Sequence, residues 1–262
     1  MPSRASASVK QTQENRATGN SGTRLAILDL APSCTLDTAS RALKGTWGGP
    51  RNSADRVNLH LSRRQVIDLL AATLFARSIG KPFNRHWTVH YELAGIAEHD
   101  AARFIGKLID LARKQARRDG GELAAAWARE GGDGKGGHVH MMLHLPPGMT
   151  LRNRTRRWIK AAGGTARRRA SKVRIIAGMK AKENIGGGGD EGATLANVSI
   201  GEHYRVNANA VLSYLLKGAD AATAGELGLT RYGEAGPIIG KRAGWTQNIG
   251  EAARERWRDD RK

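Results

Sequence analysis

The stretch 130–146 constrains this chain more than any other, because two predicted strands flank a glycine-rich turn. In a hairpin centred on that turn, Glu130 lies directly opposite His138, and His140 follows on the same strand face. Opposed residues have Cβ atoms about 4.5–5.5 Å apart, so one carboxylate and two imidazoles converge. The sequence therefore predicts a divalent-metal site formed by Glu130, His138 and His140.

The other face of the second predicted strand is apolar, as expected of a side that packs on a core: it carries Val139, Met141, Leu143 and Leu145. His144 shares the face of the two histidines. At about 3.3 Å per residue it lies about 13 Å beyond His140, which is too far to bind the same ion. We therefore exclude His144 from the predicted metal site.

The net charge predicts the class of partner. The chain of 262 residues carries 43 basic and 24 acidic side chains, a formal charge of +19. With no apolar run of membrane-spanning length, this excess favours nucleic acid over a membrane, although charge can also serve only solubility. Cys34 is the only cysteine, which excludes a disulfide framework and a cysteine-type zinc cluster. Without a secretory apolar core near the start, a bacterial cytoplasm is the expected location.

Hydrophobic periodicity predicts the elements around the hairpin. A capping-box pattern at Ser62 and Gln65 predicts a helix over about 63–78, and alternation over about 86–93 predicts a half-buried strand. Apolar residues at helical spacing predict a second helix over about 100–119. Strand, helix and hairpin in this order favour an α+β fold, with a central antiparallel sheet and helices packed on one face.

Three regions are expected along the chain. Residues 1–56 are polar and basic with little periodicity, which predicts an irregular tail. Residues 57–220 contain the predicted elements and form one expected domain, with a basic insertion at 150–185. We expect residues 221–262 to form a basic C-terminal extension that makes auxiliary contacts with DNA.

The insertion contains twelve basic residues between positions 152 and 182 and no acidic one. They are Arg152, Arg154, Arg156, Arg157, Lys160, Arg167, Arg168, Arg169, Lys172, Arg174, Lys180 and Lys182. A solvated charged helix usually mixes signs. An unmixed run with Trp158 inside it instead favours contact with a phosphate backbone and stacking on bases. We therefore predict that this stretch binds DNA.

A later helix, predicted to be capped by Asn207 and to end near Lys217, places Tyr214 and Lys217 three residues apart on one face. An ordinary half-buried aromatic and a last-turn lysine are the alternatives for these two residues. Tyr204 lies ten residues upstream of Tyr214, so the helix offers no second tyrosine spaced with it.

Together these residues resemble the HUH endonucleases. His138-Val-His140 resembles their histidine–hydrophobic–histidine motif, Glu130 stands where they often have a third metal ligand, and Tyr214-Leu-Leu-Lys217 resembles their nucleophile motif. The tyrosine follows the histidines, as in replication initiators and unlike conjugative relaxases. The resemblance covers about 85–218 and implies a Rep-like fold with a ferredoxin- or RRM-like palm.

The resemblance implies a single-tyrosine, metal-dependent nickase and strand transferase. Tyr214 is expected to form a 5′-phosphotyrosine with one DNA strand, and Glu130, His138 and His140 to hold Mn²⁺ or Mg²⁺. A phenol with a pKa of about 10 needs help to attack at neutral pH, which is the role expected of Lys217.

The expected substrate is single-stranded DNA or an origin hairpin of a plasmid or phage replicating by the rolling-circle route. No Walker-type loop follows Tyr214, so a host helicase and polymerase are the expected partners. Two alternatives stay open. One is a single-tyrosine transposase or mobilisation relaxase with the same site, and the other is a non-catalytic DNA-binding regulator on an HUH scaffold.

Overall fold

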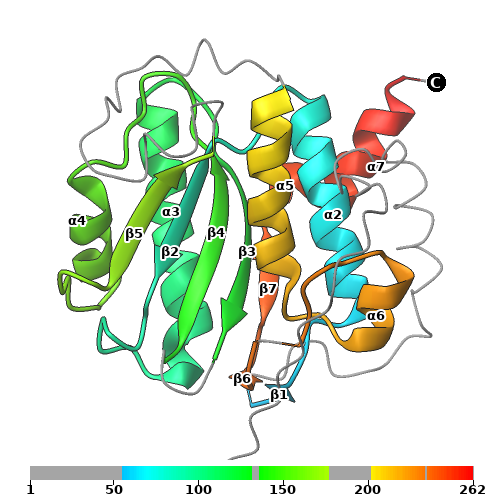
Figure 1. Ribbon diagram of the computed structural model, residues 1–262. Helices are drawn as coiled ribbons and strands as arrows, with labels where there is room; N and C mark the ends of the chain where they lie inside the picture. Colours follow the sequence, from blue (N-terminus) through cyan, green and yellow to red (C-terminus); the bar gives the residue numbers. More distant parts are fainter. Residues whose placement is uncertain (1–54, 132–135, 177–201, 234, 262) are drawn as a thin grey trace, which may run out of the picture.

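A computed structural model describes residues 55–131, 136–176, 202–233 and 235–261 (Figure 1). The predicted N-terminal tail falls outside the described residues except for its last two, and so do Lys180 and Lys182. The strands are β1 (Val57–Asn58), β2 (Arg85–Val89), β3 (Ala124–Glu130), β4 (His138–His144), β5 (Ser171–Ile175), β6 (Ile238–Ile239) and β7 (Ala243–Trp245). The α-helices are α2 (Arg63–Ser78), α3 (Ala101–Arg118), α4 (Arg154–Ala161), α5 (Glu202–Leu216), α6 (Ala221–Glu226) and α7 (Glu251–Asp259).

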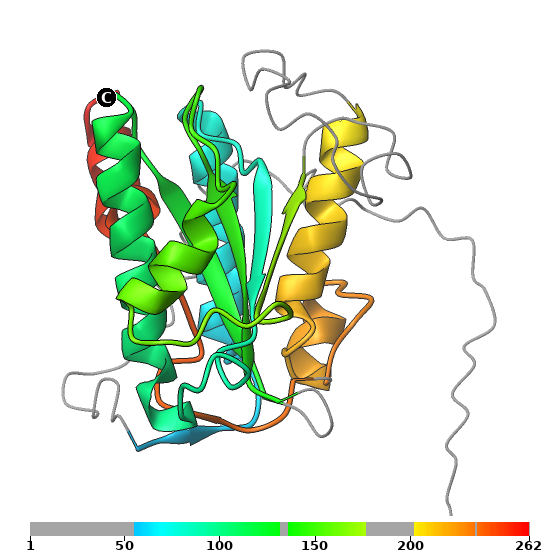
Figure 2. The same ribbon diagram turned by 90° about the vertical axis from the view of Figure 1, so that its left-hand side faces the viewer.

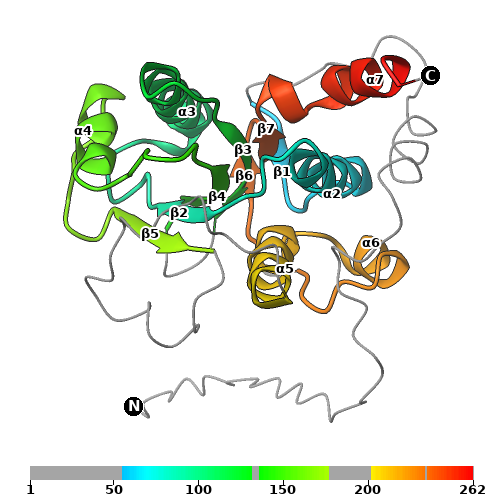
Figure 3. The ribbon, with the colours of Figure 1, turned by 90° about the horizontal axis from the view of Figure 1, so that it is seen from above.

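Five strands form the central sheet in the order β5-β2-β4-β3-β7, and every neighbouring pair is antiparallel. β1 and β6 form a separate two-stranded sheet. The predicted α+β class with a central antiparallel sheet is confirmed. The helices, however, cover both faces of the sheet, so the expectation of one covered face is wrong (Figures 2 and 3).

The two faces are packed by different helices. α3 and α4 pack on the face that carries Trp87, Trp127 and Met141, whereas α2 and α5 pack on the opposite face. β3 is buried along its whole length, and its first residues are alanines that face both layers. A strand covered on both sides loses the polar–apolar alternation that marks a half-exposed strand, so its sequence does not reveal the second helical layer.

The predicted helix starts are confirmed in one case and wrong in another. Ser62 and Gln65 form the expected capping box, with reciprocal hydrogen bonds at the start of α2. α5 already includes Glu202, so Asn207 lies inside the helix and does not cap it. The apolar stripe that holds α5 on the sheet also begins earlier, at Tyr204, which is 3% exposed.

The chain after residue 220 takes part in the sheet and is not a separate extension. β7 pairs with β3, with Ala128 opposite Ala243, and so forms one edge of the central sheet. Its three residues are too few to be recognised as a strand from periodicity. Among the described helices, none is long and apolar enough to cross a membrane.

Candidate active site

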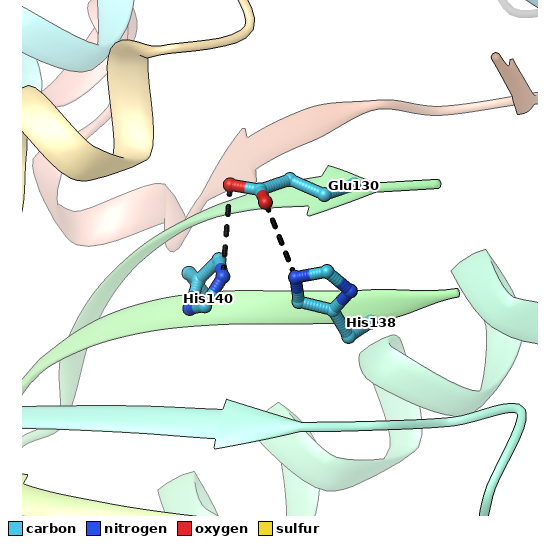
Figure 4. A group of neighbouring side chains, drawn as sticks. All are labelled: Glu130, His138 and His140. Atoms are coloured by element: carbon cyan, nitrogen blue, oxygen red, sulfur yellow. Dashed lines mark ion pairs between the residues drawn. The ribbon is translucent and has the colours of Figure 1, made fainter. Parts of the chain in front are cut away.

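The predicted hairpin has the expected register. Glu130 on β3 pairs with His138 on β4, and Ala128 pairs with His140, so the carboxylate and both imidazoles project from one face of the sheet. One ligand atom from each of the three residues lies within 4.8 Å of the others (Figure 4). All three residues are buried, with exposed fractions of 3–5%. This group can hold a metal ion.

Two polar atoms of the group lack a hydrogen-bond partner, and a bound cation would supply one to each. His138 Nε2 lies 3.1 Å from Glu130 Oε2, and His140 Nε2 lies 3.6 Å from Glu130 Oε1. Glu130 Oε1 and His140 Nε2 are buried without a hydrogen-bond partner. Buried polar atoms without partners are rare in proteins, and a cation bound between these two would satisfy both.

The outer nitrogens of both histidines are already engaged. His138 Nδ1 lies 2.9 Å from the carbonyl oxygen of Gly136, and since a carbonyl can only accept, Nδ1 carries the proton. His140 Nδ1 lies 3.0 Å from Thr88 Oγ1 and 3.1 Å from His86 Nε2. Engaging Nδ1 in this way leaves Nε2 to bind a metal, as is usual for ligand histidines.

The charge state of the group also favours a cation. Burial alone would raise the pKa of Glu130, but the close contacts with His138, His140 and Lys217 outweigh burial and hold this pKa below its usual range. Burial lowers the pKa of His140. Near neutral pH the group therefore presents a carboxylate and a neutral imidazole, which are the forms that bind metals.

Tyr214 on α5 and Lys217, the residue after the end of α5, lie next to the same group. The Tyr214 ring meets the His140 ring edge to face, with 4.7 Å between centroids. Lys217 Nζ lies 2.9 Å from Glu130 Oε2 and 4.1 Å from the centre of the Tyr214 ring. Tyr214 is partly exposed and lies beside the group, not in the core. Through these contacts the carboxylate, the imidazoles, the tyrosine and the lysine that were predicted to act together form one cluster.

A cavity of about 780 Å³ opens over this group, and Tyr214, His138 and His140 form part of its wall. Arg168, Arg169, Lys172 and Arg174 line the cavity from β5 and the loop before it. The side of the cavity next to the sheet edge is therefore strongly positive. Such a surface favours a polyanionic ligand.

The rest of the predicted DNA-binding stretch lies elsewhere. The α4 residues Arg154, Arg156, Arg157 and Lys160 do not line the cavity, and neither do Arg152 and Arg167. α4 packs on the opposite layer, where Arg154 pairs with Asp119. Trp158 is 8% exposed and its ring lies 6.0 Å from that of Trp87. The prediction that Trp158 stacks on bases is wrong, because this ring belongs to the core.

Three residues of the site were missed in the sequence. His86 and His90 on or just after β2, with Thr88 between them, line the cavity. The alternation over 86–93 places these polar residues on one strand face. The missing information was that β2 pairs with β4, where Thr88 lies opposite His140.

Two other side chains are excluded from the site by their positions. Tyr204 is buried in the core, where its hydroxyl donates to the carbonyl oxygen of Phe83 at 2.9 Å, so it is not a second nucleophile. His144 lies outside the metal-binding group, as predicted, and its Nδ1 is 2.8 Å from the carbonyl oxygen of Pro82.

The buried His86 predicts a dependence of stability on pH. Burial, with the charges of His140 and Arg174, lowers the pKa of His86 from 6.5 to about 3. Between these values the unfolded chain binds more protons than the folded one, so the free energy of unfolding falls as the pH falls. His86 contributes up to about 1.4 kcal/mol per pH unit.

Denaturant unfolding in EDTA from pH 4 to pH 7 tests this. We expect His86→Phe to reduce the slope of the free energy of unfolding against pH. A residual slope from His140 and His144 remains, because burial lowers the pKa of both. Equal slopes for the parent and the variant would contradict the prediction.

Comparisons of the chain with protein-family models, curated proteins and solved structures found no match.

Proposed function

We propose that this protein nicks single-stranded DNA and transfers the cut strand, in a metal-dependent reaction that passes through a 5′-phosphotyrosine on Tyr214. The observation that carries the proposal is the contact between a tyrosine and a buried metal-binding group at one cavity with a basic wall. A tyrosine beside a cavity, a buried carboxylate–histidine group and a basic cavity wall are each common in proteins. Their combination matches what nucleophilic attack on a phosphodiester requires.

The reaction forms one bond and breaks one. The Tyr214 hydroxyl oxygen attacks phosphorus, the bond from phosphorus to the 3′-oxygen breaks, and the phenol proton is lost as the 3′-oxygen gains one. The products are a strand with a free 3′-hydroxyl and a 5′-phosphate joined to the tyrosine. Because the phosphodiester bond is exchanged and not hydrolysed, a second 3′-hydroxyl can reverse the step and ligate the strand.

Glu130, His138 and His140 would hold the metal, and Mn²⁺ or Mg²⁺ suits a ligand set with a carboxylate. When bound, the ion stabilises negative charge on the non-bridging oxygens of the phosphate. Lys217 lies between Glu130 and the Tyr214 ring, so its ammonium favours loss of the phenol proton and neutralises phosphate charge. Arg168, Arg169, Lys172 and Arg174 contact the DNA backbone near the scissile phosphate.

The biological role in this proposal is initiation of rolling-circle replication of a plasmid or phage, with a host helicase and polymerase. The resemblance to replication initiators, in which the tyrosine follows the histidines, favours this role over transposition or mobilisation. An initiator should nick the origin of its own replicon in preference to other single strands.

The test is an adduct assay. The protein is incubated with end-labelled single-stranded DNA from the sequence flanking its gene, with Mn²⁺, with Mg²⁺ or with EDTA. We expect a labelled protein–DNA band that resists denaturation, forms only with metal, and disappears when Glu130 is replaced by alanine. If no adduct forms with any metal on any strand that the protein binds, the proposed function is wrong.

A further inference from the structure

We propose that His86 and Thr88 are positioning residues, which together accept the Nδ1 proton of His140 and so fix the tautomer that presents Nε2 to the metal. This inference rests on the metal site of the proposed function but not on DNA cleavage. Neither residue belongs to a motif recognised in the sequence, and neither is a member of the metal-binding group.

The strand pairing brings the three side chains together. Thr88 lies directly opposite His140 in the β2–β4 pair, and His86 is two residues away from Thr88 on the same strand face. His86 is 8% exposed and its ring centroid lies 5.2 Å from that of His140. The contact is therefore built into two central strands of the sheet.

The hydrogen bonds distinguish the two neutral tautomers of His140. With the proton on Nδ1, two acceptors are available: Thr88 Oγ1 at 3.0 Å and His86 Nε2 at 3.1 Å. With the proton on Nε2, the carboxylate oxygen Glu130 Oε1 lies 3.6 Å away, and Nε2 has no hydrogen-bond partner. A buried donor without an acceptor is costly, so the pair favours the Nδ1-protonated ring.

The hydroxyl of Thr88 completes the arrangement. Its oxygen lies 3.4 Å from His86 Nε2, so Thr88 can donate weakly to His86 while it accepts from His140. The acceptors behind His140 are thus an imidazole and a hydroxyl. Both of these acceptors are neutral. In many metal sites the acceptor behind a ligand histidine is instead a carboxylate. A neutral acceptor orients the ring without adding a second negative charge beside Glu130.

Metal affinity measured by calorimetry with Mn²⁺ tests this without any cleavage. Because either acceptor alone can hold the proton, the decisive variant is the double substitution His86→Phe with Thr88→Val. We expect it to weaken Mn²⁺ binding by about 10- to 100-fold. His86→Gln, whose amide oxygen reaches the position of Nε2, should stay within about threefold of the parent.

The control is His144→Phe, the same change on the site face of β4 but outside the metal-binding group. It should leave Mn²⁺ affinity unchanged. Long-range ¹⁵N–¹H spectra of the metal-free protein give a second readout: His140 should be the Nδ1–H tautomer in the parent and a mixture in the double variant. If the folded double variant binds Mn²⁺ within about threefold of the parent, the inference is wrong. An absent DNA adduct with intact Mn²⁺ binding would contradict only the proposed function.

Discussion

Replacing Tyr214 by phenylalanine is expected to abolish the covalent protein–DNA adduct while leaving DNA binding and metal binding within about twofold of the parent. The substitution removes only the hydroxyl oxygen. The ring keeps its edge-to-face contact with His140 and its contacts with Lys217 and Arg231, so the packing around the metal-binding group is retained. Loss of a nucleophile with little rearrangement typically lowers the rate by about 10³-fold or more.

Tyr204→Phe is the matched control on the same helix. The hydroxyl of Tyr204 donates to the carbonyl oxygen of Phe83 in the core, so its removal should cost about 0.5–1.5 kcal/mol of stability and leave the adduct intact. The assay is the same denaturing gel with labelled single-stranded DNA and Mn²⁺. An adduct that survives in Tyr214→Phe and is lost in Tyr204→Phe would reverse the assignment of the nucleophile.

The hairpin that carries Glu130, His138 and His140 could be predicted from sequence because its geometry is local. A glycine-rich turn joins its two strands, the apolar alternation of 139–145 determines which face packs on the apolar core under α3, and a slip of one residue would turn every side chain to the wrong face. The register of Glu130 opposite His138 follows from these two constraints. The same reasoning correctly removed His144 from the group.

The two side chains next to His140 Nδ1 could not be predicted in the same way. His86 and Thr88 reach His140 only because β2 lies next to β4, and this pairing joins segments separated by more than fifty residues, including the whole of α3. Periodicity gives the face on which a residue lies but not the neighbour of its strand. The close approach of Tyr214 depends in the same way on how α5 packs across the sheet.

The basic stretch shows the limit of reasoning from charge. The absence of acidic residues over 152–182 predicted one DNA-binding surface, but the described part of it forms a helix, α4, on the face of the sheet away from the cavity and an edge strand, β5, that lines the cavity. Trp158 and Ile159 are buried and pack α4 on the core. A count of charges along the sequence does not show this apolar side of α4. Of the basic residues in this stretch, those that line the cavity are Arg168, Arg169, Lys172 and Arg174.

Lys217 is expected to have opposite effects on metal binding and on cleavage. Its ammonium lies 2.9 Å from Glu130 Oε2 and is 6% exposed as a residue, so it competes with a cation for the same carboxylate. Burial lowers the pKa of Lys217, but the hydrogen bond and the charge of Glu130 outweigh burial and raise it, so the side chain stays charged. A bound metal ion would therefore have a fixed positive charge beside it.

Lys217→Gln removes that charge. We expect Mn²⁺ affinity to rise by about tenfold or more, because repulsion between the ion and the ammonium is lost. Without metal, Glu130 loses the ammonium that lies 2.9 Å from its carboxylate, and the free energy of unfolding should fall by about 1–3 kcal/mol. Adduct formation should fall by about 10²-fold, since the role proposed for the Lys217 ammonium in the attack on phosphorus is lost.

Calorimetry with Mn²⁺, thermal unfolding in EDTA and the adduct assay measure these three effects on one preparation. Lys160→Gln, the same change at an exposed position of α4, is the matched control and should alter none of them. Weaker Mn²⁺ binding in Lys217→Gln would mean that Lys217 holds Glu130 in place for the metal instead of competing with it. Tighter Mn²⁺ binding together with a lost adduct would show that Lys217 opposes metal binding and supports cleavage. A substitution that only damaged the fold would weaken both Mn²⁺ binding and adduct formation.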